Sequence, residues 1–170
     1  MTRLALWTTA LLTFAGGQVA AEAHTTPFML AEVSGDGISG EVSLTQTPSG
    51  IMLVQIDLTG VPEGLHGVHI HETGDCSADD FTSAGGHLAG DAGHGIMSED
   101  GPHPGDLPNA MVGADGILSV TYFNERLTTD LLDDADGAAF ILHAEADDYI
   151  SQPAGAAGDR LACGVFEMPG

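Results

Sequence analysis

The chain has 170 residues, which is enough for one domain and too few for two of ordinary size. It carries 25 acidic residues against three arginines and no lysine, and its formal net charge of −22 disfavours partners such as nucleic acid or an anionic membrane. Because 43% of the residues are apolar and occur in patterned runs, the composition is that of a folded chain and not of a disordered one.

Residues 1–23 have the pattern of a cleaved secretory signal. Arg3 precedes an apolar run of about ten residues, and residues 21–23 (AEA) form a small-x-small cleavage site. The run is too short and too interrupted by Thr and Gly to span a bilayer, and no later segment is apolar enough to do so. We therefore expect residues 24–170 to form the mature domain, in the periplasm or otherwise secreted. A buried first strand or helix is the alternative interpretation of the run.

The segments that follow are short and either apolar or alternating, which predicts β-strands. Turn-forming sequences such as SGDG, TPSG, VPEG, GADG and DADG separate them. We predict strands at residues 28–33, 40–44, 51–58, 68–71, 117–122 and 138–143, and a helical turn within 124–132. The pattern indicates an all-β fold, an antiparallel Greek-key β-barrel or sandwich. The long connection from 72 to 116 is rich in Gly, His and Asp, and a loop of that length in a small domain is typically functional.

Histidines on two of the predicted strands suggest a metal site. The two-residue period of a strand places His69 and His71 on one face, where two imidazoles can hold one ion from a rigid backbone. His143 ends the apolar strand 138–143 and can reach the same ion. By the same period His66 lies on the opposite face, so we expect it to be structural and hydrogen-bonded.

The long connection adds three more histidines and a carboxylate, His87, His94, His103 and Asp106. Three imidazoles and one carboxylate are a closed tetrahedral donor set for zinc. A single loop histidine is usually only solvated. Six histidines gathered in a chain with almost no other cationic side chains are better explained by metal binding.

Cys76 and Cys163 are the two cysteines of the chain. An even count in an exported protein favours a disulfide between them, and two buried free thiols are the alternative. Two cysteines without a CxxC spacing make a poor metal site.

Several segments together resemble the copper/zinc superoxide dismutases of the bacterial, exported kind. They are residues 64–72 (GLHGVHIHE), 74–76 (GDC), 83–87 (SAGGH), 94–95 (HG), 103–109 (HPGDLPN), 143–145 (HAE) and 158–165 (GDRLACGV). They occur in the family's order from about residue 28 to the end of the chain. The resemblance implies long metal-binding and active-site loops on the β-barrel.

The resemblance also implies the ligands of two metal cofactors. Copper is expected at His69, His71, His87 and His143, and zinc at His87, His94, His103 and Asp106, with His87 bridging the two ions. Asp147 matches the carboxylate that orients one histidine of each set, and the adjacent Asp148 is the alternative. Arg160, three positions before Cys163, matches the arginine that guides a small anion to the copper.

The activity implied is dismutation of superoxide to dioxygen and hydrogen peroxide. In the family, copper is reduced by one superoxide and reoxidised by the next, while His87 leaves copper, takes up a proton and stays on zinc. Superoxide is then the substrate partner, and a monomer and a homodimer both remain open. One alternative is a periplasmic copper/zinc-binding or copper-delivery protein without turnover, which would be expected to lose Arg160 or copper ligands. Another is a structural or adhesive β-sandwich whose histidines bind zinc alone.

The sequence departs from the family pattern in two respects that bear on function. Gly90 stands where the family commonly has proline, three residues after the bridging His87, and predicts a looser loop. The family often uses lysines near the channel to attract the anion, and this chain has none. A net charge of −22 is expected to slow an anionic substrate, which predicts a weak or inverted dependence of rate on salt.

Overall fold

The computed structural model describes residues 28–169, so the signal segment expected at residues 1–23 lies outside the described part. The strands are β1 (Met29–Gly35), β2 (Ser39–Gln46), β3 (Met52–Thr59), β4 (Gly64–His66), β5 (Val68–His71), β6 (Ala110–Val112), β7 (Ile117–Asn124), β8 (Ala139–His143) and β9 (Arg160–Glu167). The helices are a 3-10 turn at Thr82–Ala84 and α1 (Thr129–Leu132). Within residues 28–169, no helix has the length and apolar character needed to cross a membrane.

Strands form where apolar and polar side chains alternate. In β3 every second side chain from Met52 to Leu58 is buried, while Gln55 and Asp57 are exposed. Alternation of this kind buries one face of a sheet and leaves the other in water.

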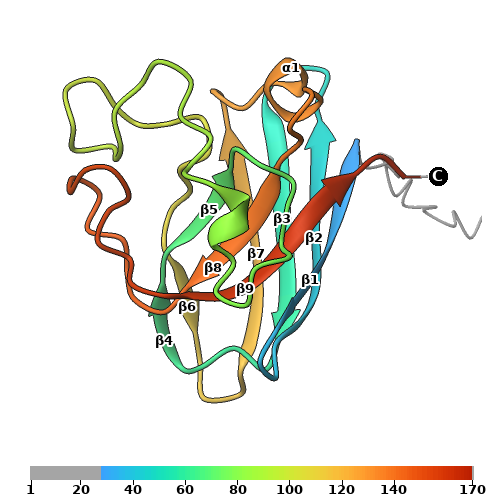
Figure 1. The fold of residues 1–170 in the computed structure, drawn as a ribbon, viewed down its shortest axis with the longest axis vertical. Coiled ribbons are helices and arrows are strands. Elements are labelled where there is room, and N and C mark those ends of the chain that lie inside the picture. The colour runs from blue at the N-terminus through green and yellow to red at the C-terminus, as the bar shows by residue number, and fades with distance from the viewer. Residues whose placement is uncertain (1–27, 170) are drawn as a thin grey trace, which may run out of the picture.

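Seven strands form one curled antiparallel sheet in the order β5-β8-β9-β1-β2-β3-β7, and β4 pairs with β6 in a second sheet (Figure 1). The register places Val42 of β2 between Ala31 of β1 and Ile56 of β3, and all three side chains are fully buried. The inner face of the curled sheet therefore holds the core, and the all-β antiparallel fold predicted from the sequence is confirmed.

Each of the six predicted strands is present, with ends shifted by at most two residues. The sequence analysis missed β4, β6 and β9, and the helical turn is confined to α1. Strand β9 contains the weak β-formers Ala162 and Gly164, and it is a strand because β8 and β1 hydrogen-bond to both of its edges. Strands β4 and β6 have three residues each and pair with one another.

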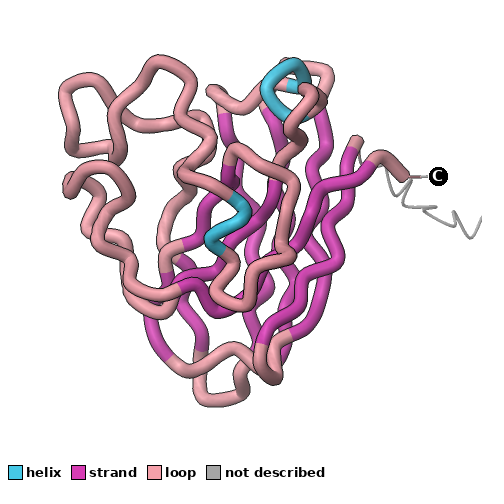
Figure 2. Tube along the Cα trace, viewed as in Figure 1, coloured by secondary structure: helices cyan, strands magenta, loops and turns pink. Residues whose placement is uncertain are grey.

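Two long irregular segments, 72–109 and 144–159, lie together on the β5 side of the sheet (Figure 2). A disulfide between Cys76 and Cys163 ties the first of them to β9, as expected from the sequence. The segments carry several of the predicted site residues, and the strands beneath them carry the others. The fold thus brings one end of the sheet and both segments to the same place.

Candidate metal centre

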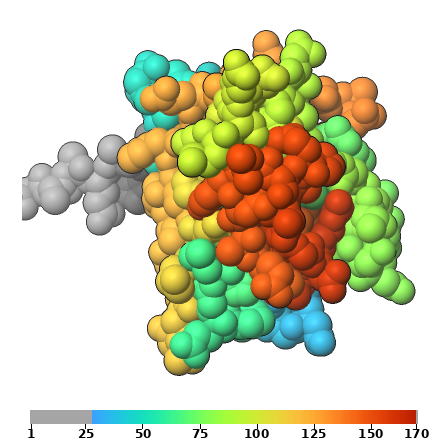
Figure 3. All heavy atoms as spheres, turned by 90° about the vertical axis from the view of Figure 1, so that its left-hand side faces the viewer, coloured from blue at the N-terminus to red at the C-terminus, as the bar shows by residue number. Residues whose placement is uncertain are grey.

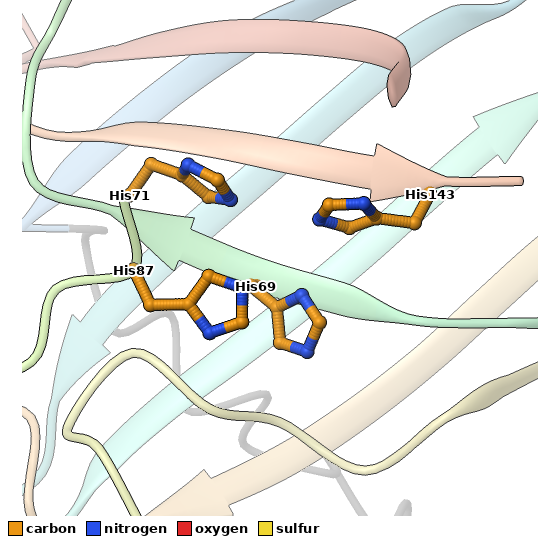
Figure 4. Close-up of side chains that lie close together, drawn as sticks. All are labelled: His69, His71, His87 and His143. Atoms are coloured by element: carbon orange, nitrogen blue, oxygen red, sulfur yellow. The ribbon is translucent and has the colours of Figure 1, made fainter. Parts of the chain in front are cut away.

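Four buried histidines form what we call the first donor set. One ring nitrogen of each of His69, His71, His87 and His143 lies within 4.8 Å of the others. The β5 alternation points His69 and His71 to the same side, and β8 is hydrogen-bonded to β5, so His143 lies beside them. An isolated bridge pairs His87 with His71. Figure 4 shows the four rings converging from β5, β8 and the connecting loop.

The converging nitrogens are the ones without a hydrogen-bond partner. They are His69 Nδ1, His71 Nε2, His87 Nε2 and His143 Nε2. The opposite ring nitrogens are engaged: His69 Nε2 donates to Asp147 at 2.8 Å, and His71 Nδ1 donates to the Gly85 carbonyl at 3.0 Å. Buried polar atoms are rarely left unpaired, so lone pairs aimed at one point fit a metal ion there.

Burial keeps the imidazoles of His69, His71 and His143 neutral. It lowers the pKa of His69 to about 4, that of His71 to about 2 and that of His143 to about 3, against an ordinary value of 6.5. Neighbouring imidazoles and the Arg160 charge lower the pKa values of His71 and His143 further. Neutral imidazoles at pH 7 are the form that binds metal.

The second donor set is His87, His94, His103 and Asp106, again with its donor atoms within 4.8 Å of one another. The Nδ1 atoms of His87, His94 and His103 lie 2.9, 3.1 and 3.3 Å from Asp106 Oδ1. Three nitrogens around one carboxylate oxygen fit the tetrahedral set expected for zinc. His87 belongs to both sets, with Nε2 in the first and Nδ1 in the second.

The carboxylate of Asp106 is held in place by the loop itself. Its Oδ2 accepts the backbone N–H of Gly95 at 2.8 Å and that of His103 at 3.0 Å. Burial alone would raise the pKa of Asp106, but these contacts and the His87 hydrogen bond keep it well below its ordinary value. Asp106 is therefore an anion and available as a ligand.

Asp147, and not Asp148, lies between the two donor sets. Its Oδ2 accepts from His69 Nε2 at 2.8 Å and its Oδ1 accepts from His94 Nε2 at 3.0 Å. Asp148 is exposed, and its carboxylate accepts from Ser151 and the Ile150 N–H. One buried carboxylate thus orients a histidine of each set.

Arg160 begins β9 and is paired with His143 across a bulge in the sheet. Its guanidinium donates to the carbonyl oxygens of Phe81 at 2.6 Å and Gly85 at 2.7 Å. The same Gly85 carbonyl accepts from His71, so Arg160 is fixed next to the first donor set. A pocket of about 490 Å³ beside Arg160 is lined by Asp80, Thr82, Gly158, Asp159 and Arg160.

His66 has the structural role expected from its position. Its Nδ1 lies 2.8 Å from the His143 carbonyl oxygen, and its Nε2 lies 2.9 Å from the Pro62 carbonyl oxygen.

The glycine at position 90, where the family commonly has proline, has a conformational reason. Its φ of +56° is in the left-handed region, which proline cannot adopt.

The sequence analysis gave no role to Asn109 or Gln152, and both hold the site together. The Asn109 amide donates to the Asp147 carbonyl and accepts the Asp147 N–H, each at 2.8 Å. The Gln152 amide bonds to the backbone of His94 in the same two-sided way. Asn109 closes the segment HPGDLPN and so carried a weak signal, whereas no pattern marks Gln152.

Comparison with known proteins places the chain in a family. The model of the copper/zinc superoxide dismutase family matches residues 38–166. The chain is 39% identical over 143 residues to the Cu-Zn superoxide dismutase of Caulobacter vibrioides, covering 79% of this chain and 82% of the relative. It is 38% identical over 135 residues to Cu-Zn superoxide dismutase 1 of Aquifex aeolicus, covering 75% and 79%. The crystal structure of a SOD-like protein from Bacillus subtilis matches with a TM-score of 0.72 at 34% identity, covering 80% of this chain and 96% of that one. The chain therefore belongs to the copper/zinc superoxide dismutase family.

Proposed function

We propose that this chain dismutates superoxide to dioxygen and hydrogen peroxide, with copper in the first donor set and zinc in the second. The observation that carries the proposal is the shared imidazole of His87, which turns one ring nitrogen to each set. An all-imidazole set suits copper, and a set with one hard carboxylate suits zinc. The names of the relatives from Caulobacter vibrioides and Aquifex aeolicus support the same activity.

The residues around the two sets supply what the reaction needs beyond the metals. Copper in the first set would take one electron from one superoxide and give one to the next, which zinc cannot do. Arg160 supplies a permanent positive charge and N–H donors for the small anion at the pocket it lines. His87 can hold a proton at Nε2 while its Nδ1 stays in the second set, and can give that proton to the peroxide product.

We also infer that the protein is exported and that its mature form begins near His24. The motif at residues 1–23 supports removal of a signal. The disulfide between Cys76 and Cys163 supports an oxidising compartment such as the periplasm.

A metal-binding or copper-delivery role without turnover is the second candidate. The similarity to a protein described only as SOD-like favours it. Against it stand Arg160 and the complete first donor set, since a protein without turnover has no need of an anion-binding arginine beside four imidazoles.

Single substitutions that address each donor set separately test the proposal. His71→Ala is expected to lose copper and activity but keep zinc, because His71 belongs to the first set only. His103→Ala is expected to lose zinc and keep copper, and His87→Ala is expected to weaken both. Metal content and superoxide decay measured on each purified variant give the answer. Loss of both metals to the same extent in His71→Ala and His103→Ala would contradict two separate sets.

A further inference from the structure

The side chain of Gln152 connects the segment after β8 to the backbone of His94. Its Oε1 accepts the His94 N–H at 2.9 Å, and its Nε2 donates to the His94 carbonyl at 2.8 Å. Nε2 also lies 3.0 Å from Ser98 Oγ, which itself donates to the His94 carbonyl. Both backbone polar groups of a fully buried ligand residue are thus held by one amide.

The two segments joined by Gln152 touch backbone to backbone. Gly95 has a φ of +85°, and a Cβ added to it would lie 2.0 Å from the Tyr149 carbonyl oxygen. The Met97 N–H donates to the same oxygen at 3.1 Å. In Figure 3 the orange-red segment after β8 lies against the yellow-green loop that carries His94. His94 therefore has its position fixed from outside its own loop.

His94 is held at three points, and only one of them is shared with the first donor set. Its Nε2 donates to Asp147, which also accepts from His69, whereas its backbone is held by Gln152. Nδ1 is left facing Asp106 and the other nitrogens of the second set. The two contacts of Gln152 to His94 do not involve the Asp147 carboxylate, which serves both sets. The Nε2 atom of Gln152 also donates to the Ile150 carbonyl of its own segment at 3.2 Å.

From this geometry we propose that Gln152 is a positioning residue for the second donor set, acting on zinc affinity through the backbone of His94. The inference rests on the proposed zinc site. Contacts that orient a metal ligand typically change metal affinity by about 10- to 100-fold when they are removed. Gln152 acts through the backbone and is exposed to solvent, so we expect about a tenfold weakening of zinc binding in Gln152→Ala.

Zinc affinity of the metal-free protein, measured by competition with a chromophoric chelator, tests the proposal. Copper affinity is measured in parallel, and the absorption spectrum of Co²⁺ in the second set reports the ligand geometry. Gln152→Ala is expected to bind zinc more weakly, to shift the Co²⁺ spectrum and to bind copper as the wild type does. Gln152→Glu can still accept the His94 N–H but cannot donate to its carbonyl, so we expect an intermediate zinc affinity.

Two further variants make the test specific. Gln55→Ala, an exposed glutamine on β3, is the matched control and is expected to bind both metals as the wild type does. Asn109→Ala loosens Asp147, which contacts both sets, and is expected to weaken both metals.

Zinc affinity unchanged in Gln152→Ala, or copper and zinc weakened by the same factor in that variant, would overturn the role of Gln152. Wild-type protein that binds no zinc would overturn the zinc site itself, which keeps the two failures apart.

Discussion

Opening the disulfide between Cys76 and Cys163 is expected to destabilise the metal-free protein by about 4.6 kcal/mol. The two cysteines are 87 positions apart, and the loop-closure entropy for that length gives this value at 25 °C. Replacing both cysteines with alanine keeps a small apolar side chain where Cys163 packs against Ala84, Ala139 and Ile141. Most of the loss should therefore come from the greater freedom of the unfolded chain.

Urea unfolding followed by circular dichroism measures this change on the metal-free wild type and the Cys76→Ala/Cys163→Ala variant. Metal-free protein is required because bound metal would add its own binding free energy to the stability. Wild type treated with a thiol reductant should lose a similar amount, and the variant should not respond to the reductant. A difference below about 1 kcal/mol between the two proteins would refute the loop-closure reasoning.

Four other predictions concern the pocket beside Arg160, the net charge and the buried histidines. Arg160→Leu removes the fixed charge at the pocket and is expected to lower kcat/KM for superoxide by at least about tenfold in stopped-flow decay assays; an unchanged value would remove Arg160 from substrate guidance. Asp80→Asn is expected to raise kcat/KM by about twofold, because it removes a negative charge beside Arg160. With a net charge of −22, the wild-type rate should change little or rise as salt is added, and a steep fall would contradict this. The metal-free protein should lose stability as the pH falls below 6.5. Histidines of the unfolded chain take up a proton near that pH, whereas the pKa values of His69, His71 and His143 in the folded protein are about 4, 2 and 3, so protons favour the unfolded chain. Urea midpoints that stay constant from pH 7 to about pH 5 would speak against buried neutral histidines.

The strands could be predicted where their side chains alternate or form a continuous apolar run. They could not be predicted where a strand forms only because it pairs with neighbouring strands. Residues 51–58 alternate clearly, and β3 occupies nearly the same range. Strand β9 has little pattern of its own and depends on hydrogen bonds to β8 and β1. Local sequence could not reveal that, because the pairing partners are far along the chain.

The site could be predicted to the extent that its chemistry shows in residue type. The histidines and one aspartate occur in an order that resembles the family's, so both donor sets could be predicted. The structure brings the members of each set together. The choice between Asp147 and Asp148 needed the fold, since neighbouring residues point in different directions. The role of Gln152 could not be predicted from the sequence. Its partner His94 lies 58 positions away, and a single glutamine is not part of any recognisable motif.

Metal content of the purified mature protein, measured together with superoxide dismutation in the presence and absence of cyanide, tests the central claim most directly. The two donor sets and Arg160 predict one copper and one zinc per chain and fast turnover that cyanide inhibits. Copper and zinc without turnover would contradict the enzyme and support a delivery or storage role. Zinc alone would contradict the assignment of copper to the first donor set.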